Sequence, residues 1–373
     1  MDKCRGLMKE NGGAVLLTRE TTVRWLTGFE GAESCALLMD GEKYFVTDSR
    51  YAEAAEKQIP GDFRVLSEKT GISAVPELIR KLGAKKVFAE IRQLSLFQAK
   101  QIEEKTGAQI VPIDDEIAAM RSVKSSAEIE KMKIGAKLTE EAFMHICRYM
   151  KPGVSEYDIY AELLYFLHKN GSEPSFTPII AGGENSSMPH ASVTNRKLRE
   201  GDFLTIDMGC KTDGVCTDFT RTVAISGVVQ RQQMIYNIVE EAHQAAMAAV
   251  KNGAFSKAAD TAARDLITER GFGDCFGHGT GHGVGYDIHE APTVNGRSDE
   301  VLKSGMVVTI EPGIYLPGEM CIRDRICGDT GNGYRQSHKS GDCTGFYRTD
   351  TKVISKIHSS YNEQSGAGNE EGN

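Results

Sequence analysis

The chain has 373 residues, 40% of them hydrophobic and 26% charged, which predicts a soluble protein of two domains. Its formal net charge of −8 argues against nucleic acid as the main partner, and its longest apolar runs, at 14–17 and 35–39, are too short to cross a bilayer. Nine cysteines without a Cys-x-x-Cys pair, and no apolar stretch after the first basic residues, favour a reduced, cytoplasmic protein without a secretion signal.

The N-terminal third alternates short apolar strands with helical patterns. Strands are predicted at residues 14–17, 36–39, 44–46 and 86–89, and helices at 51–58, 72–82 and 95–105. Ser95 is the expected N-cap of the last helix, and Pro112 with the acidic run 114–116 marks the end of the segment. The pattern predicts a small α/β domain over residues 1–121.

Longer helices and separated strands follow. A charged helix is predicted at 126–149, and a second at 156–170, closed by Gly171. Strands are predicted at 178–181, 203–208, 215–225 and 306–310, interrupted by a helix at 232–250. Because strands and helices are segregated, residues 122–325 are expected to form an α+β domain rather than a doubly wound sheet.

Two aspartates lie on the strands that flank a predicted hairpin. Lys-Thr-Asp-Gly at 211–214 is a strong turn signal between them. A four-residue loop would place Asp207 directly opposite Asp218, whereas a two-residue Asp-Gly turn would shift the pairing by two and leave both on one face. Carboxylates side by side on a sheet repel each other unless a cation lies between them. The alternative is a pair of exposed hairpin acids.

Three histidines, His278, His282 and His289, lie in a glycine-rich segment at 276–290. The glycines allow the backbone to approach a site closely, and their spacing fits neither a dinucleotide fingerprint nor a Walker motif. Neutral imidazole is the commonest transition-metal ligand among side chains. The alternative is that these histidines only hydrogen-bond the backbone of their own loop.

Glu311 ends an apolar strand and is followed at once by Pro312, so it is expected at a strand end or on a sheet face. Taken alone, such a glutamate is more often solvated than catalytic. Together with Asp207, Asp218 and His282, however, it gives three carboxylates and one imidazole. That set suits manganese, cobalt, iron or zinc better than copper.

These motifs in this order resemble the pita-bread metallopeptidases, a family that includes aminopeptidase P, prolidase, methionine aminopeptidase and the metal-free creatinases. The pattern is Asp, Asp eleven residues later, His within Gly-His-Gly-x-Gly-His-Gly-x-Gly, then Glu-Pro-Gly. Trp-Leu-Thr-Gly-Phe at 25–29 and Thr-Asp-Ser-Arg-Tyr at 47–51 resemble the creatinase-type N-terminal domain. The resemblance covers roughly residues 10–319. It implies a pita-bread catalytic domain at 122–325, preceded by a creatinase-like domain.

The resemblance implies two divalent metal ions, manganese first, with cobalt, zinc or iron as alternatives. By this resemblance Asp207 would hold one ion and Asp218 would bridge both. His282 and Glu311 would complete the ligand set.

The resemblance also implies catalytic roles. His190 and His289 match histidines that contact the substrate and the tetrahedral intermediate, and His278 matches a histidine near the substrate cleft. The implied reaction is hydrolysis of the bond before proline, by a hydroxide formed between two cations about 3.5–4 Å apart. Glu311 would relay the proton, and His190 or His289 would donate to the oxyanion. We expect a cytoplasmic homodimer that acts on proline-containing peptides, with neither nucleic acid nor membrane as partner.

The C-terminal end departs from the family pattern. The family has a fifth ligand, a bridging glutamate, about fourteen residues after Glu311, where this chain has Arg325. We therefore expect no family strand beyond residue 320 and a divergent or disordered tail at 326–373. We interpret the change as a frameshift or an artefactual junction near residue 320, and the alternative is a genuinely divergent tail.

Three other assignments compete with the Xaa-Pro peptidase. A non-catalytic pseudo-peptidase is favoured by the missing fifth ligand alone. Methionine aminopeptidase is disfavoured by the N-terminal module, and a creatinase-like hydrolase by the intact metal-ligand set. The sequence leaves open whether the substrates are dipeptides or longer peptides.

Overall fold

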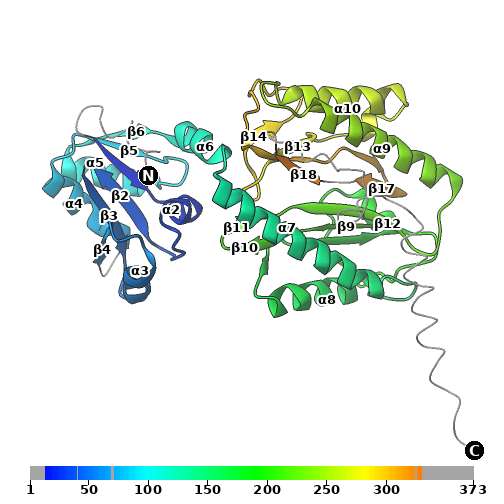
Figure 1. Ribbon diagram of the computed structural model, residues 1–373, viewed down its shortest axis with the longest axis horizontal. Helices are drawn as coiled ribbons and strands as arrows, with labels where there is room; N and C mark the ends of the chain where they lie inside the picture. Colours follow the sequence, from blue (N-terminus) through cyan, green and yellow to red (C-terminus); the bar gives the residue numbers. More distant parts are fainter. Residues whose placement is uncertain (1–12, 40, 69–70, 324–325, 330–373) are drawn as a thin grey trace, which may run out of the picture. The chain divides into compact units, whose positions relative to one another are not determined.

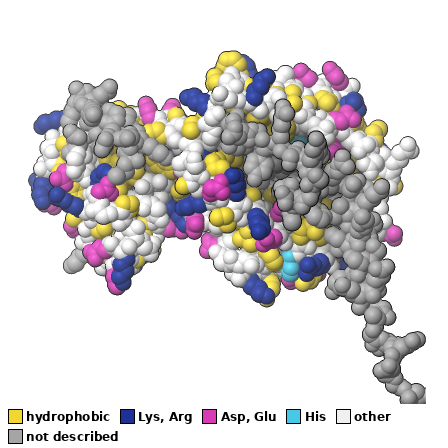
Figure 2. Space-filling view, in the orientation of Figure 1, with side chains coloured by type: hydrophobic (Ala, Val, Ile, Leu, Met, Phe, Trp, Pro, Cys, Tyr) yellow, Lys and Arg dark blue, Asp and Glu magenta, His cyan; other side chains and the backbone are white. Residues whose placement is uncertain are grey.

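The computed structural model describes residues 13–39, 41–68, 71–323 and 326–329. The chain divides into two compact units with the boundary between Ser122 and Val123, and each unit has its own sheets (Figure 1). Figure 2 shows basic and acidic side chains interspersed over the visible face of each unit. Among the described helices, none combines the length and apolar content that crossing a bilayer requires.

The N-terminal unit is built on one six-stranded mixed sheet in the order β4-β3-β2-β1-β5-β6. Its strands are β1 (Ala14–Leu17), β2 (Cys35–Met39), β3 (Glu42–Thr47), β4 (Arg64–Ser67), β5 (Lys86–Ala89) and β6 (Gln109–Pro112). Its helices are α2 (Glu20–Thr27), α3 (Ala52–Gln58), η2 (Gly71–Ala74), α4 (Val75–Leu82), α5 (Leu96–Thr106) and α6 (Asp114–Ser122). Val15 and Leu17 enter one apolar cluster and Ala14 and Leu16 another, so the sheet is covered on both faces.

The predicted α/β character of this unit is confirmed. All four predicted strands are present, and α5 begins at a capping box in which the Gln98 backbone N–H donates to Ser95 Oγ at 3.2 Å. The sequence analysis missed β4, β6, α2 and α6, all of which are short or only partly buried.

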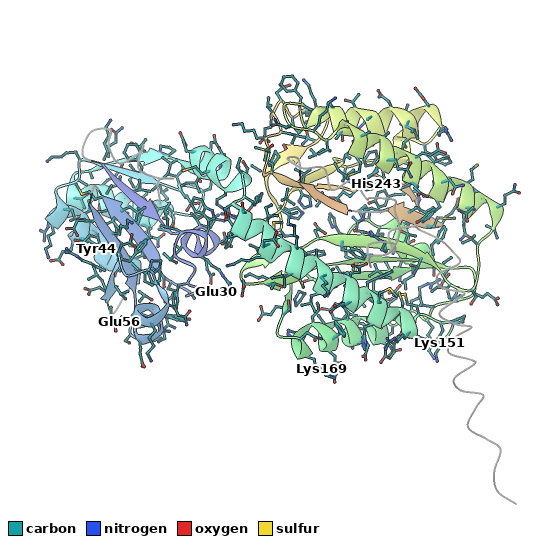
Figure 3. All side chains as sticks on the ribbon, viewed as in Figure 1. Glu30, Tyr44, Glu56, Lys151, Lys169 and His243 are labelled. Atoms are coloured by element: carbon teal, nitrogen blue, oxygen red, sulfur yellow. The ribbon has the colours of Figure 1, made fainter. Side chains whose placement is uncertain are left out.

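The C-terminal unit places its strands between two helix pairs. Figure 1 shows α7 (Ser126–Ile146) and α8 (Glu156–Lys169) on one side and α9 (Gln230–Ala249) and α10 (Lys257–Glu269) on the other. Of the residues labelled in Figure 3, Lys169 is the last residue of α8, Lys151 lies in the loop before α8, and His243 lies on α9. Each helix pair has its own apolar core against the strands. Short 3-10 turns complete the unit: η3 (Cys147–Tyr149), η4 (Gly183–Ser187) and η5 (Gly273–Cys275).

Four small sheets form the centre of this unit, in the orders β12-β9-β8, β11-β10-β7, β14-β13-β15-β18 and β16-β17. The strands are β7 (Glu173–Pro174), β8 (Ile179–Gly182), β9 (Phe203–Met208), β10 (Cys210–Thr212), β11 (Val215–Cys216), β12 (Phe219–Ala224), β13 (Gly281–Gly283), β14 (Glu290–Val294), β15 (Val307–Ile310), β16 (Gly313–Leu316), β17 (Met320–Arg323) and β18 (Ile326–Asp329). The expected α+β class is confirmed.

Several details of the prediction need correction. The strand expected at 215–225 is two strands, β11 and β12, and the sequence analysis missed α10, β13, β14 and β16. No family strand was expected beyond residue 320, yet β17 pairs with β16 and β18 pairs with β15. Of the tail expected at 326–373, the first four residues form β18, and 330–373 lie outside the described residues.

Candidate metal centre

The register of the aspartate hairpin is fixed by a two-residue turn. Thr212 pairs with Val215, and both turn residues have positive φ, 48° at Asp213 and 85° at Gly214, as a type I′ turn requires. The four-residue alternative is therefore wrong. In the same register Asp207 pairs with Thr220, which leaves Asp218 two residues away on the same face. Asp207 and Asp218 are 3% and 4% exposed, so the alternative of exposed hairpin acids is wrong too.

Asp207 has a protein donor on each carboxylate oxygen. Thr220 Oγ1 donates to Oδ1 at 2.8 Å, and Arg323 Nη2 donates to Oδ2. Arg323 is buried on β17, where its backbone N–H donates to the Thr222 hydroxyl of β12 at 3.2 Å. The sequence analysis missed Arg323 and placed its unexpected cation at Arg325, which lies outside the described residues. A carboxylate oxygen that accepts one hydrogen bond keeps a second lone pair, so Asp207 can still bind a cation.

Asp218, His282 and Glu311 come together from three separate parts of the chain. His282 Nε2 lies 3.4 Å from Asp218 Oδ2 and 3.2 Å from Glu311 Oε1. The side chains of the two acids are 0% and 6% exposed, and that of His282 is 13% exposed. His282 Nδ1 contacts the carbonyl of the next residue at 3.0 Å. Nδ1 thus makes the loop contact of the alternative interpretation, while Nε2 faces the two carboxylates.

The strands around His282 approach one another so closely that glycine is required. A Cβ on Gly281 would lie 1.9 Å from the Thr309 carbonyl oxygen. Thr309 Oγ1 accepts the backbone N–H of His282 at 3.0 Å and donates to Glu311 Oε1 at 2.9 Å. The Glu311 backbone N–H donates in turn to the Thr280 carbonyl at 2.7 Å. Thr309 thus links the backbone of His282 to the carboxylate of Glu311. Its only signal in the sequence is a hydroxyl residue two positions before Glu311.

Helix α10 holds the segment that carries His278. Asp260, 1% exposed, accepts the backbone N–H and the hydroxyl of Thr280 at 3.1 and 2.8 Å. Arg264, paired with Asp260, donates to the carbonyls of Phe276 and His278 at 2.8 and 2.7 Å. The pairing with Asp260 raises the pKa of Arg264, so its charge is permanent. These contacts fix the backbone on both sides of the first histidine.

The remaining predicted histidines differ in their surroundings. His278 Nε2 lies 2.8 Å from the Tyr315 hydroxyl, and its Nδ1 contacts the carbonyl of the next residue at 2.7 Å. His289 is exposed, with its ring centroid 4.2 Å from that of His282, so it lies directly beside the proposed ligands. His190 is exposed on the segment that follows η4.

A buried ion pair supports the residue next to His289. Lys124 Nζ lies 2.8 Å from Glu290 Oε1, with side-chain exposures of 3% and 9%. A Cβ on Gly285 would lie 2.3 Å from the same oxygen, so the turn leaves no room for a side chain there. Breaking a buried pair by removing one partner leaves an uncompensated charge, so this contact fixes the turn firmly.

The donor set fits divalent cations by its chemistry. Within the described residues, no three His, Cys, Asp or Glu side chains are already arranged as the ligands of one ion. Donors that bind one ion at about 2.0–2.2 Å lie roughly 3–3.5 Å from one another. The separations of 3.2 and 3.4 Å around His282 Nε2 fall in that range. Three buried carboxylates also need positive charge nearby to remain ionised.

Known proteins share both parts of the chain. Residues 130–339 match metallopeptidase family M24, and residues 1–123 match the creatinase/prolidase N-terminal domain. A Xaa-Pro dipeptidase of Pyrococcus furiosus is 32% identical over 335 residues, which cover 87% of this chain and 94% of that protein.

Solved structures of similar proteins cover most of the chain. A Xaa-Pro dipeptidase from Bacillus anthracis is 36% identical with a TM-score of 0.84, over 89% of this chain and 94% of that one. An X-Pro aminopeptidase from Thermotoga maritima is 32% identical with a TM-score of 0.82, over 88% and 96%.

Proposed function

The chain belongs to metallopeptidase family M24 and carries a creatinase/prolidase-type N-terminal domain, and on that premise we propose that it is a Xaa-Pro exopeptidase. The observation that carries the proposal is the convergence of Asp218, Glu311 and His282 from three distant segments, with buried Asp207 on the same sheet face as Asp218. The names of the relatives, Xaa-Pro dipeptidase and X-Pro aminopeptidase, support a cut beside proline.

Asp207, Asp218, His282 and Glu311 would hold two divalent ions in this proposal. Three oxygen ligands to one nitrogen ligand favour a hard cation, so manganese comes first and cobalt, zinc or iron follow. When bound, such ions polarise a carbonyl group and lower the pKa of water toward neutrality.

Side chains of the protein would transfer the proton and contact the oxyanion and the substrate. Glu311, whose Oε1 is held by Thr309, would take and return the proton of the attacking water. His289, exposed beside His282, would donate a hydrogen bond to the oxyanion, as would His190 from its loop. His278, oriented by the Tyr315 hydroxyl, would line the substrate cleft. An amide before proline lacks an N–H, so recognition of the substrate rests on other groups.

The proposal also covers the cellular compartment, the partners and the domain bounds of the protein. The free cysteines among the described residues support a reducing, cytoplasmic compartment, and the net charge of −8 supports the absence of nucleic acid partners. The division after Ser122 supports an N-terminal domain at 1–121 and a catalytic domain that begins at 122. Because β18 pairs with β15, we place the end of the catalytic domain beyond the expected residue 325, at Asp329 or later. We also propose that the protein is a homodimer, and light scattering of the purified protein tests this.

One experiment tests the function. Chelator-stripped protein is loaded with Mn²⁺ and given a Xaa-Pro dipeptide, a Xaa-Pro-Xaa tripeptide and the matching Xaa-Ala peptides. We expect cleavage before proline only, abolished by chelator and restored by Mn²⁺. The dipeptide and tripeptide rates distinguish a dipeptidase from an aminopeptidase. Protein that binds two ions and cleaves neither proline peptide would refute the proposal.

A second candidate is an impaired or non-catalytic pseudo-peptidase. Arg325 stands where the family has its fifth ligand, and Arg323 binds the Asp207 carboxylate. The test is to restore an in-frame Val-Arg-Ile-Glu-Asp segment with a family-like terminal strand and helix. The impaired candidate predicts that the restored protein gains metal and activity, whereas equal metal content and rate in both proteins would exclude it.

A further inference from the structure

The segment that carries His190 is closed at its base by one buried carboxylate. Glu156 is the first residue of α8 and is 0% exposed. Its Oε1 accepts the backbone N–H of Gly182 at 2.8 Å, and its Oε2 accepts the backbone N–H and the hydroxyl of Thr194 at 3.0 and 2.7 Å. Gly182 and Thr194 are the two ends of the segment 183–193, so the carboxylate joins the point where the chain leaves β8 to the point where it returns.

Further donors saturate the same carboxylate. Asn185 Nδ2 lies 3.1 and 3.3 Å from its two oxygens and 3.2 Å from the Thr194 hydroxyl. The backbone N–H of Glu156 donates to the Arg196 carbonyl at 3.0 Å. A carboxylate has about four lone-pair sites, all facing N–H or O–H donors here. An amide in its place would turn one donor toward other donors.

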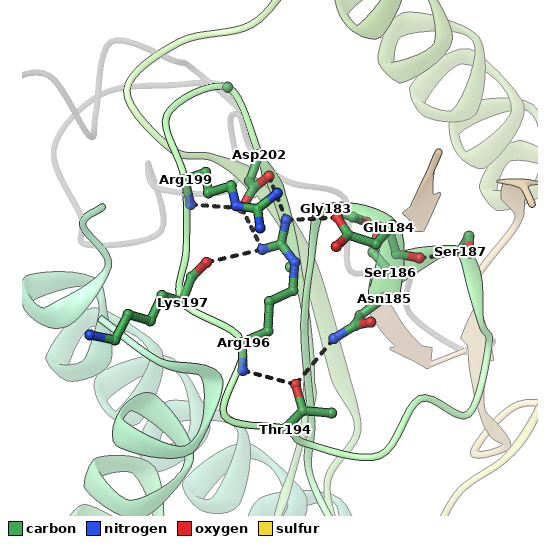
Figure 4. Close-up of polar contacts among 12 residues, drawn as sticks. Gly183, Glu184, Asn185, Ser186, Ser187, Thr194, Arg196, Lys197, Arg199 and Asp202 are labelled. Carbon is green, nitrogen blue, oxygen red and sulfur yellow. Dashed lines mark hydrogen bonds and ion pairs between the residues drawn. The ribbon is translucent and has the colours of Figure 1, made fainter. Parts of the chain in front are cut away.

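Arg196 also contacts the base of the segment (Figure 4). Its guanidinium donates to Asp202 Oδ2 at 2.6 Å and to Glu184 Oε2 at 2.8 Å. The hydrogen bond from Arg196 lowers the pKa of Glu184 to about 2. Gly183 has φ +52°, and a Cβ there would lie 2.3 Å from Arg196 Nη2, so the first residue of the segment must be glycine.

The base of the segment is tied to the strands of the metal centre. β8 pairs with β9 so that Ile179 lies opposite Asp207. Ser186 Oγ, in η4, accepts the backbone N–H of Cys321 at 2.9 Å, and Cys321 belongs to the strand that carries Arg323. The orientation of the segment is thus fixed relative to Asp207 and its partner.

We propose that Glu156 is a positioning residue that acts through His190. Met188, Pro189 and His190 are all exposed, Met188 to 51%, so packing at the tip does little to order it. We infer that the order of the tip depends on the base, where the Glu156 carboxylate accepts hydrogen bonds from Gly182, Asn185 and Thr194. This inference rests on the proposed function, in which His190 donates to the oxyanion.

The test compares Glu156→Gln with Glu162→Gln on metal-loaded, full-length protein. Glu162 lies on the same helix, but its partner is His145 at 2.6 Å, away from the segment. Removing one oxyanion donor lowers kcat by about 10²–10³-fold, so a displaced His190 should cost Glu156→Gln roughly 10- to 100-fold in kcat. We expect KM to change less than about twofold and metal content to stay constant, because the lost contact forms only in the transition state. The control, Glu162→Gln, should have the kcat, KM and metal content of the wild type.

A double-mutant cycle separates positioning from general stabilisation. In a His190→Ala background, Glu156→Gln should lower kcat by less than about twofold more, because the group it positions is gone. Hydrogen exchange of residues 183–193 should accelerate in Glu156→Gln and not in Glu162→Gln. If Glu156→Gln fails to fold, Thr194→Val, which removes one donor to Oε2, should show a smaller loss with the same non-additivity.

Two results would overturn the inference. Independent, multiplying losses in the double variant would show that Glu156 does not act through His190. Unchanged kcat and unchanged exchange in Glu156→Gln would show that the carboxylate does not order the segment. If the wild type cleaves no Xaa-Pro peptide, the proposed function fails by itself, and the exchange comparison still decides whether Glu156 closes the base.

Discussion

Replacing Thr309 with valine should weaken metal binding without removing a ligand. Thr309 is 0% exposed, and its hydroxyl accepts the His282 backbone N–H and donates to Glu311 Oε1. Valine has nearly the same shape as threonine but lacks the hydroxyl that accepts one hydrogen bond and donates the other. The strand is therefore kept, while the backbone N–H of His282 and the carboxylate of Glu311 each lose a hydrogen-bond partner.

The expected size follows from these two bonds. A hydrogen bond to a charged group contributes about 1.5–3 kcal/mol and one between neutral groups about 1 kcal/mol. We expect Thr309→Val to lower the free energy of unfolding of the metal-free protein by roughly 2–4 kcal/mol. Loss of a group that orients a ligand typically costs about 10–100-fold in metal affinity.

Calorimetric titration of chelator-stripped protein with Mn²⁺ measures that affinity, and urea unfolding measures stability. Thr27→Val is the matched control, because the buried Thr27 hydroxyl also accepts one backbone N–H, from Phe29 at 3.1 Å, and donates once, to the Val23 carbonyl at 2.8 Å. The Thr27→Val protein should have a lower free energy of unfolding and the same affinity for Mn²⁺ as the wild type. A Thr309→Val protein that binds Mn²⁺ as tightly as the wild type would show that this hydroxyl does not organise the ligands.

Three further predictions concern single side chains. Asp218→Asn should lose most bound metal and nearly all Xaa-Pro hydrolysis, as metal analysis and peptide assays would show; full retention would contradict its role as a ligand. His289→Ala should turn over slowly with its metal intact, whereas His282→Ala should lose metal, and equal metal loss would contradict the division of roles. Because Arg196 lowers the pKa of Glu184 from 4.5 to about 2, the pair stabilises the fold above pH 4.5 and stops doing so as pH falls toward 2. Glu184 is half exposed, so Glu184→Gln should be less stable at pH 7 by under about 1 kcal/mol, with a difference that vanishes on acidification; a difference that persists at low pH would contradict this.

Local patterns were enough to select the four residues of the candidate centre, because each of them carries a local signal. Alternation along two strands places Asp207 and Asp218 on one face for either turn that the sequence allows. Choosing between the turns needed backbone angles, since only the structure shows positive φ at both Asp213 and Gly214. The glycines beside His282 likewise signal a close approach, although not the strand that approaches.

Contacts between distant segments could not be predicted in this way. Arg323 meets Asp207 across 116 residues, and Glu156 meets Thr194 across 38. On the sequence alone, Glu156 is an ordinary acid in the first turn of a helix. The sequence analysis assigned the residues after 320 to a divergent end, so it missed β17, whose Arg323 donates to a buried carboxylate from a distant strand.

The charges of the centre predict stepwise metal binding. Asp207, Asp218 and Glu311 carry three negative charges, and buried Arg323 offsets one of them. One divalent ion then neutralises these four side chains, and a second would add two charges that these four do not offset. Because buried uncompensated charge is costly, the first ion should bind much more tightly than the second. Calorimetric titration should show two separate steps, or one step only. Two equal, tight sites would mean that residues outside the described range supply the missing negative charge.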